Sequence, residues 1–270
     1  MQRSCQLTKK IKDVIIFLLC RSVGTGIQVG LKNRWGQLHE GSTPSFGIYS
    51  QFMGIRCFKW TSNLAYAVGL ITTDGNLSSD KRHISITSSD KQLLYTFRKC
   101  LNLKNKITKN PKGGYTKRQC YRIQFGNVCF YNWLISIGLM PRKTFRIKAI
   151  KIPHKFLADF LRGHLDGDGS IATYEDKYNT FKNPKYIYKR LYVNFLSASQ
   201  KHIKWISYKL KKIINIRGDI STYKKDKTNM HKLRFAKKES LKLLQWLYYK
   251  PNLYCLKRKR KIAESFLRKI

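Results

Sequence analysis

The sequence predicts an α+β fold made of two similar halves, each with the element order α-β-β-α-β-β-α. Two apolar, helix-compatible segments, LAYAVGLITTDGNL at 64–77 and LADFLRGHLDGDGSI at 157–171, each carry a central glycine and end in aspartate followed by glycine. The same succession of strand and helix patterns follows each of them. A repeated element that ends each time in an acid indicates a site built on a pseudo-twofold axis.

The elements of the first half follow its apolar segment in order. A period-two strand at 83–87 runs into a helix whose apolar positions include Leu93 and Phe97. A basic hairpin comes next, with turn residues at 111–114, and a helix around Trp133 closes the half.

The second half repeats this order. A strand and a helix are expected over 191–214, a basic hairpin over 219–235, and a closing helix around Trp246. This half also carries an additional basic and aromatic stretch at 173–195, which predicts a longer hairpin. A basic tail ends each half, beginning at Pro141 in the first and at Leu256 in the second.

These patterns predict three segments. Residues 61–152 form the first half and residues 153–270 the second. Residues 1–60 are rich in Gly and Ser without a clear period, and we expect a weakly structured N-terminal extension there. Met53 is a candidate alternative start, in which case the residues before it would not be translated.

The net charge of +41, from 55 Lys and Arg against 14 Asp and Glu, indicates a nucleic-acid partner. The sequence has no run of about 18 apolar residues, so no membrane span is expected. It also shows no long basic amphipathic helix of the kind that binds a membrane surface. The seven cysteines are scattered without zinc-ligand spacing, which is typical of reduced thiols. We therefore expect a bacterial cytoplasm or an organellar matrix or stroma, and no secretion.

The strands alternate between apolar and polar residues, so one sheet face can pack on helices while the other faces a polyanion. The stretches 121–125 and 231–235 share this alternation in register. Because strands in a groove can reach base edges, such a surface could read a DNA sequence. The candidate DNA contacts are Lys117, Arg118, Arg122, Gln124, Lys185, Lys189, Arg190, Lys224, Lys225, Lys232 and Arg234.

Small residues recur four positions apart in the two apolar segments. Gly69 and Thr73 form one such pair, and Gly163 and Gly167 form the other. Small residues at this spacing leave a flat strip where two helix backbones can approach closely. These four residues therefore predict the contact between the two segment helices.

Asp74 and Asp168 then fall at the C-terminal ends of their helices. The helix macrodipole is negative there, and two close-packed helices would bring like charges together. Divalent cations bound between the carboxylates would offset both costs. Oxygen ligands suit Mg²⁺, which could activate water and stabilise the leaving oxygen of a phosphodiester.

The stretches AVGLITTDG and LRGHLDGDG resemble the two signature motifs of single-chain LAGLIDADG homing endonucleases, and the resemblance covers about residues 63 to 265. It implies motif helices at the interface of the halves and two saddle-shaped antiparallel sheets along the DNA major groove. It also implies a staggered double-strand break in a long asymmetric target. Mg²⁺ would be held by Asp74 and Asp168, with the carbonyls of Thr73 and Gly167 as helper ligands.

The resemblance extends to residues around the implied cleavage centre. By position, Lys143 and Lys259 match pocket lysines that follow each closing helix. Asp90 and Gln200 match a polar position at a strand end. All four are candidate catalytic residues.

The first motif departs from the pattern, because Thr72 stands where the second motif has Asp166. That position serves the helix end, so its loss does not indicate inactivation. His164 lies within the second motif helix, where we expect it to pack or hydrogen-bond.

The leading hypothesis is a monomeric, Mg²⁺-dependent DNA endonuclease encoded by a mobile intron or related element. One alternative is a splicing maturase that binds its host intron RNA on the same scaffold. Another is a transcription regulator on a degenerate copy of the fold, for which lost acids and an added helix-turn-helix would be expected.

Overall fold

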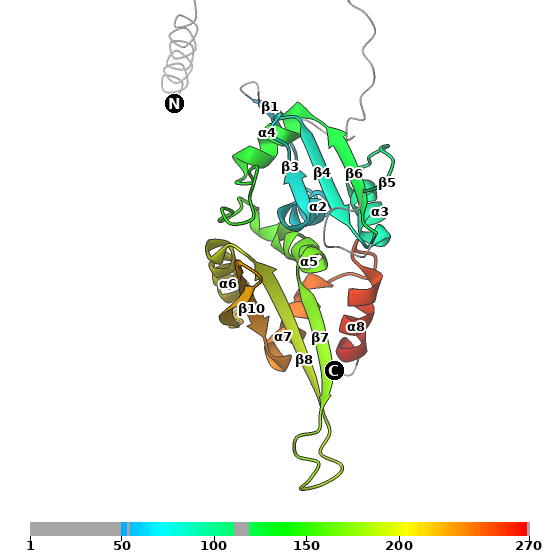
Figure 1. Cartoon of the computed structure of the whole chain (residues 1–270), viewed down its shortest axis with the longest axis vertical. Coiled ribbons are helices and arrows are strands. Elements are labelled where there is room, and N and C mark those ends of the chain that lie inside the picture. Colours follow the sequence, from blue (N-terminus) through cyan, green and yellow to red (C-terminus); the bar gives the residue numbers. More distant parts are fainter. Residues whose placement is uncertain (1–49, 53–54, 111–118, 269–270) are drawn as a thin grey trace, which may run out of the picture. The chain divides into compact units, whose positions relative to one another are not determined.

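The computed structural model of this protein describes residues 50–52, 55–110 and 119–268 (Figure 1). A short two-stranded hairpin precedes the halves and consists of β1 (Ser50–Phe52) and β2 (Ile55–Cys57). The first half contains α2 (Ser62–Thr73), β3 (Gly75–Leu77), β4 (His83–Ser88), α3 (Lys91–Cys100), β5 (Thr108–Lys109), β6 (Tyr121–Gly126) and α4 (Val128–Ser136). The second contains the 3₁₀ turn η1 (His154–Phe156), α5 (Leu157–Gly167), β7 (Ser170–Asp176), β8 (Tyr188–Ser197), α6 (Gln200–Ile214), β9 (Asp219–Lys225), β10 (Thr228–Phe235), α7 (Lys237–Leu247) and α8 (Lys257–Leu267).

Two four-stranded antiparallel sheets, one in each half, confirm the predicted α+β class. Their strand orders are equivalent, β3-β4-β6-β5 in the first half and β7-β8-β10-β9 in the second. In both sheets the second strand of the half pairs with the strand that precedes the closing helix, as Ile84 of β4 pairs with Phe125 of β6. The repeat that the sequence indicates is therefore a repeat of topology.

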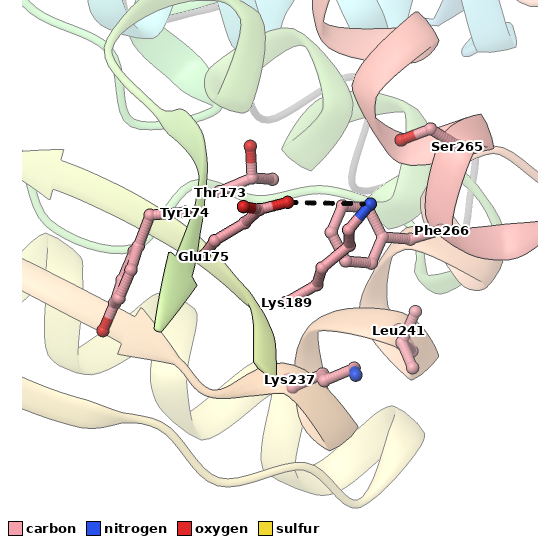
Figure 2. Close-up of a pocket in the computed structure, with 8 residues that line it drawn as sticks. All are labelled: Thr173, Tyr174, Glu175, Lys189, Lys237, Leu241, Ser265 and Phe266. Atoms are coloured by element: carbon pink, nitrogen blue, oxygen red, sulfur yellow. Dashed lines mark ion pairs between the residues drawn. The ribbon is translucent and has the colours of Figure 1, made fainter. Parts of the chain in front are cut away.

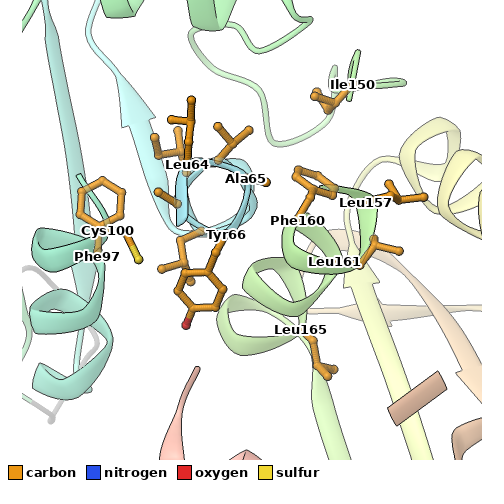
Figure 3. Close-up of a cluster of buried hydrophobic side chains, with 14 of the residues drawn as sticks. Leu64, Ala65, Tyr66, Phe97, Cys100, Ile150, Leu157, Phe160, Leu161 and Leu165 are labelled. Atoms are coloured by element: carbon orange, nitrogen blue, oxygen red, sulfur yellow. The ribbon is translucent and has the colours of Figure 1, made fainter. Parts of the chain in front are cut away.

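The two motif helices, α2 and α5, pack on one another between the two sheets (Figure 1). Figure 3 views α2 along its axis, with Phe97 and Cys100 of α3 on one side and Phe160 and Leu161 of α5 on the other. Every residue of α2 from Leu64 to Thr72 is buried. This helix is apolar all round because the other motif helix and the elements of its own half cover it from every side.

Thr61 begins α2. Its backbone is extended, and its Oγ1 accepts a hydrogen bond from the Leu64 backbone nitrogen at 3.1 Å. Such a cap satisfies one of the donors left free at a helix start. We expect Thr61→Ala to lower the free energy of unfolding by about 1 kcal/mol, measured by urea denaturation, whereas Thr61→Ser should match the wild type. A Thr61→Ser variant as unstable as Thr61→Ala would contradict the capping role.

A buried arginine of α5 forms an ion pair within this helix and also bonds to the end of α7 and to the segment that follows it. Arg162 contacts Asp159 one turn earlier, with 2.6 Å between Nη2 and Oδ1, and both side chains are 1% exposed. The guanidinium also donates to the carbonyl oxygens of Leu247 and Tyr254 at 2.9 Å. These bonds satisfy a charge that would be costly to bury alone, so they fix α5 in the second half.

Two features differ from the expectations. Phe58 and Trp60, assigned to the extension, pack against Trp133 of α4, with ring centroids 5.5 and 5.0 Å away. The packed part of the first half therefore begins before residue 61, and residues 1–49 lie outside the described residues. The tail expected from Leu256 is the helix α8. None of the helices in the described residues is long and apolar enough to span a membrane.

Candidate active site and nucleic-acid interface

The two motif helices touch through their central glycines. A Cβ added to Gly69 would overlap the carbonyl oxygen of Phe160 and lie 2.8 Å from the backbone nitrogen of His164. A Cβ added to Gly163 would overlap the carbonyl oxygen of Tyr66 and lie 3.2 Å from the Gly69 Cα. Backbone lies against backbone here, so any larger residue would separate the helices.

The same close packing continues to the helix ends. Asp74 is the C-cap residue of α2 and Asp168 that of α5, and both have helical backbone angles. A Cβ added to Gly167 would overlap Thr73 Oγ1 and lie 2.7 Å from Asp74 Oδ2. The Asp74 carboxylate therefore lies against the end of α5, and the structure brings the four predicted helix-contact residues and both aspartates into one place.

Burial and mutual repulsion disfavour the charged forms of the two carboxyl groups. Burial raises the pKa of Asp74 to about 6, and the neighbouring Asp168 carboxylate adds to this rise. A hydrogen bond from Thr73 Oγ1 and the cations of Lys143 and Lys259 act against it. Burial likewise raises the pKa of Asp168, and the same two lysines oppose the shift.

Lys143 and Lys259 hold the backbone at the two helix ends in a related way. Lys143 Nζ donates to the carbonyl oxygen of Thr73 at 3.2 Å and to that of Gly75. Lys259 Nζ donates to the carbonyl oxygens of Leu165, Asp166 and Gly169 at 2.5, 3.0 and 2.7 Å. The lysines are 8% and 4% exposed, and burial lowers the pKa of each to about 8.

The donor set suits Mg²⁺, which proteins usually bind through one or two carboxylates while phosphates and waters complete the shell. Asp74 and Asp168 supply two such carboxylates, and burial is the largest cause of the raised pKa of each. The described residues contain no cluster of three or more His, Cys, Asp or Glu that could form an all-protein metal cage. The arrangement therefore fits a metal shared with a phosphate ligand.

Asp90 and Gln200 lie at equivalent helix starts. Asp90 caps α3 by accepting from the Gln92 backbone nitrogen at 3.0 Å, and its other carboxylate oxygen lies 3.3 Å from Arg258 Nε. Gln200 is the first residue of α6 and lines a cavity with Arg146. Asp90 thus contacts an arginine near the C-terminus and has a structural role as a cap.

A polar cavity of about 170 Å³ beside Asp168 was not predicted from the sequence. Lys143, Asp168, His164 and His202 are among its lining residues. The two imidazoles stack with centroids 5.2 Å apart. Burial lowers the pKa of His202 to about 4 and that of His164 well below its usual range, so both are neutral at pH 7.

Asp166, near the end of the second motif helix, links this helix to the first motif helix and to the segment before α8. Its Oδ2 accepts hydrogen bonds at 2.8 Å from Tyr66 of the other motif helix and from the backbone nitrogen of Leu256. The carboxylate is buried and fixes the residue before α8, the helix that carries Lys259. Thr72, its counterpart in the first motif, donates to Val68 within its own helix, so the two halves are held differently.

The strand register divides the candidate DNA contacts between two sheet faces. Arg122 and Gln124 lie on the open face of the first sheet, opposite Thr87 and Ser85. On the second sheet, the open face is the one that does not contact the helices. Arg234 and its partner Asn194 lie on this face, and every second residue along each strand lies on it with them. It carries the candidates Arg190, Lys225, Lys232 and Arg234.

Two candidates, Lys189 and Lys224, lie on the opposite face of the second sheet. Lys189 shares the phase of the buried residues Leu191 and Val193, and it lies 3.9 Å from Glu175 in a cavity beside α7 and α8 (Figure 2). Lys224 shares the phase of Ile220, which is opposite buried Leu233. Side chains alternate along a strand, so each points away from the open face.

The remaining candidates lie outside the sheets. Lys185 lies in the exposed loop between β7 and β8. Lys117 and Arg118 lie outside the described residues.

Comparisons with known proteins found similar solved structures and one matching family model. Full-length DUF199/WhiA from Thermatoga maritima is 15% identical, with 80% of this chain and 63% of that chain covered and a TM-score of 0.46. I-DmoI in complex with DNA and Ca is 14% identical, with 75% and 97% covered and a TM-score of 0.49. The LAGLIDADG meganuclease I-AabMI bound to uncleaved DNA is 13% identical, with 74% and 87% covered and a TM-score of 0.49.

No curated protein matches the sequence. The family model described as a LAGLIDADG-like domain matches residues 62–132, which include the first motif helix and most of the first half. This match covers the first of the two motifs and confirms the resemblance over residues 62–132.

Proposed function

We propose that this protein is a site-specific, Mg²⁺-dependent endonuclease that hydrolyses both strands of a DNA duplex. One observation carries the proposal: Asp74 and Asp168 end two helices in backbone contact, and a buried lysine accompanies each helix end. The raised pKa of both acids means that the ionised pair destabilises the fold unless cations bind. An arrangement with this cost is expected where the chemistry requires it.

In the proposed mechanism the two carboxylates hold the metal ions, and the carbonyls of Thr73 and Gly167 are the candidate helper ligands. Bound Mg²⁺ would supply Lewis acidity that activates a water molecule and stabilises the leaving oxygen. The open faces of the two sheets would bind the duplex, so that one phosphodiester of each strand lies near the aspartates.

Lys143 and Lys259 have different capacities for this chemistry. Three carbonyl oxygens accept from the Lys259 ammonium, which uses all of its N–H groups. Lys143 donates to two, so within the described residues it retains one N–H, and it lines the cavity beside Asp168. With a pKa of about 8 it is charged at pH 7 and able to donate a proton to a departing oxygen.

We therefore expect Lys143→Met to slow cleavage by about a hundredfold and to change duplex affinity little. Lys259→Met should instead lower the free energy of unfolding by about 1–3 kcal/mol, because it leaves three buried carbonyls without this donor. Cleavage rates, duplex affinities and urea denaturation measure the difference, with exposed Lys242→Met as control. Equal losses of affinity and rate in Lys143→Met would make it a phosphate contact only.

The alternatives differ in what they require of the aspartates. A maturase or a transcription regulator would bind nucleic acid without chemistry, so neither needs two buried carboxylates in contact. Retention of both acids supports the nuclease. The two motif helices pack on one another within one chain, so neither needs a second copy to cover its contact surface, which supports a monomer. We place its gene in a mobile intron or related element, with the uninterrupted insertion site as target.

The direct test is incubation of the full chain with a duplex that carries the uninterrupted insertion site, with Mg²⁺ or with EDTA. The expected result is a staggered double-strand break that needs Mg²⁺. Binding should weaken steeply as salt rises. Tight binding without a break, together with a gain in intron splicing when protein is added, would favour the maturase and overturn the nuclease.

A further inference from the structure

The hairpin of β7 and β8 is longer than the equivalent hairpin of β3 and β4 in the first half. β7 pairs with β8 over seven positions, from Ser170 with Asn194 to Asp176 with Tyr188. The equivalent strands β3 and β4 pair over three positions. Figure 1 shows the loop between β7 and β8 extending past the ends of α7 and α8.

The loop holds large aromatic side chains in solvent. Tyr178 and Phe181 are 80% and 74% exposed, and their rings meet edge to face with centroids 6.3 Å apart. The backbone is ordered by consecutive turns, as in the bond from the Tyr178 nitrogen to Asp176 Oδ1 at 3.0 Å. An ordered, exposed aromatic cluster indicates a contact surface.

The charge of this segment indicates what it contacts. Residues 177–190 contain five Lys and Arg and no Asp or Glu, and Asp176 before them pairs with Arg190, with 2.6 Å between Oδ2 and Nη2. The strand register continues the open face of the second sheet outward from Arg234 through Tyr192 and Arg190, and the Arg234 guanidinium lies 3.7 Å from the Tyr192 ring centroid. Cations and aromatic rings on one strip suit a partner with phosphates and bases.

We infer that the β7–β8 hairpin binds duplex DNA beyond the outer end of the second half's share of the target, with Tyr178 and Phe181 against sugars and base edges. This inference rests on the proposed function for its orientation on DNA. The four additional strand positions span ~13 Å. Along a groove that length covers about four base pairs, so the footprint would be longer on this side.

The test is hydroxyl-radical footprinting and affinity measurement without divalent cations, on a long duplex recovered by binding selection from a random-sequence library. The variants are Tyr178→Ser/Phe181→Ser and, as control, Tyr208→Ser, which alters a 58% exposed ring on α6. Arg234→Ala identifies the side of the footprint that the second half covers. Thermal unfolding of the double variant should equal that of the wild type, because both rings are exposed.

The double variant is expected to lose the outermost protections on the Arg234 side and to bind about tenfold more weakly. Tyr208→Ser should keep both. On a duplex shortened at that side, wild type and double variant should bind equally. Unchanged protections and affinity would overturn the inference. Because no cleavage is measured, a protein that binds but never cuts would refute the nuclease and leave this result standing.

Discussion

Asp74→Asn is expected to abolish cleavage and, at pH 8 without divalent cations, to stabilise the fold. The loss of a metal ligand should slow cleavage by about a thousandfold, and Asp168→Asn should do the same. Duplex affinity should change little, because these side chains lie at the helix ends and not on the sheet faces that we propose bind DNA. Single-turnover cleavage and equilibrium binding measure the two effects separately.

The gain in stability follows from the direction of the pKa shift. The pKa of Asp74 is raised from 3.8 to about 6, so between these pH values the folded state holds a proton that the unfolded state has lost. Stability therefore falls as pH rises through this window and stays lower above it. The shift corresponds to about 3 kcal/mol, which Asn avoids, so thermal unfolding at pH 8 should occur several degrees higher in the variant.

Two comparisons make this prediction specific. Asp80 has its pKa lowered by hydrogen bonds from His83 and backbone N–H groups, so Asp80→Asn should shift stability at pH 8 in the opposite direction. Mg²⁺ should raise the melting temperature of the wild type by binding the folded state, and it should not raise that of Asp74→Asn/Asp168→Asn. An equal Mg²⁺ response in both proteins would remove the aspartates from the metal site.

Gly163→Ala is expected to be among the most destabilising single-methyl additions in the chain. The new Cβ would overlap the Tyr66 carbonyl oxygen, and a backbone atom cannot move aside without separating α2 from α5. Overpacking of this kind costs about 1–3 kcal/mol or more, which exceeds the ~1 kcal/mol that alanine gains over glycine in a helix. The cleavage rate should fall together with the stability, because the contact between the two helices also sets the positions of Asp74 and Asp168 at their ends.

Gly126→Ala is the matched control. Its added Cβ would lie 3.2–3.3 Å from the side chains of Arg82 and His83, which can shift. Urea denaturation should show near wild-type stability for Gly126→Ala and a clear loss for Gly163→Ala and Gly69→Ala. If all three variants unfold alike, the close approach of the motif helices is wrong.

The sequence is informative where local pattern and tertiary role coincide. The central glycines and terminal aspartates mark both motif helices, and alternation in 121–125 marks β6. The same alternation, counted back from Leu191, would have placed Lys189 on the helix face. The helix α8 was missed because its KRKRK start lacks apolar periodicity, and its buried Lys259 makes contacts with distant carbonyls.

Other parts of the site carry no local signal. His164 and His202 come from different helices and meet only in the fold, so no spacing announces their stacked pair. The bond between Tyr66 and Asp166 joins residues on separate motifs. Such contacts depend on how α2 and α5 are placed relative to one another. The small residues indicate that the two helices pack closely, but they do not determine how each helix is rotated about its axis.

Each half is hydrogen-bonded to a segment of the other half, one between α4 and η1 and one at the start of α8. Ser199 Oγ donates to the carbonyl oxygen of Ile147 in the linker, at 2.5 Å, and Gln92 of α3 bonds to the backbone of Cys255 and Lys257 near the C-terminus. A half transplanted into another protein would leave one of these attachments behind. The exchangeable unit is therefore a half together with the segment that its neighbour contributes, and a second half given a new partner would lose the bonds that Gln92 makes with Cys255 and Lys257.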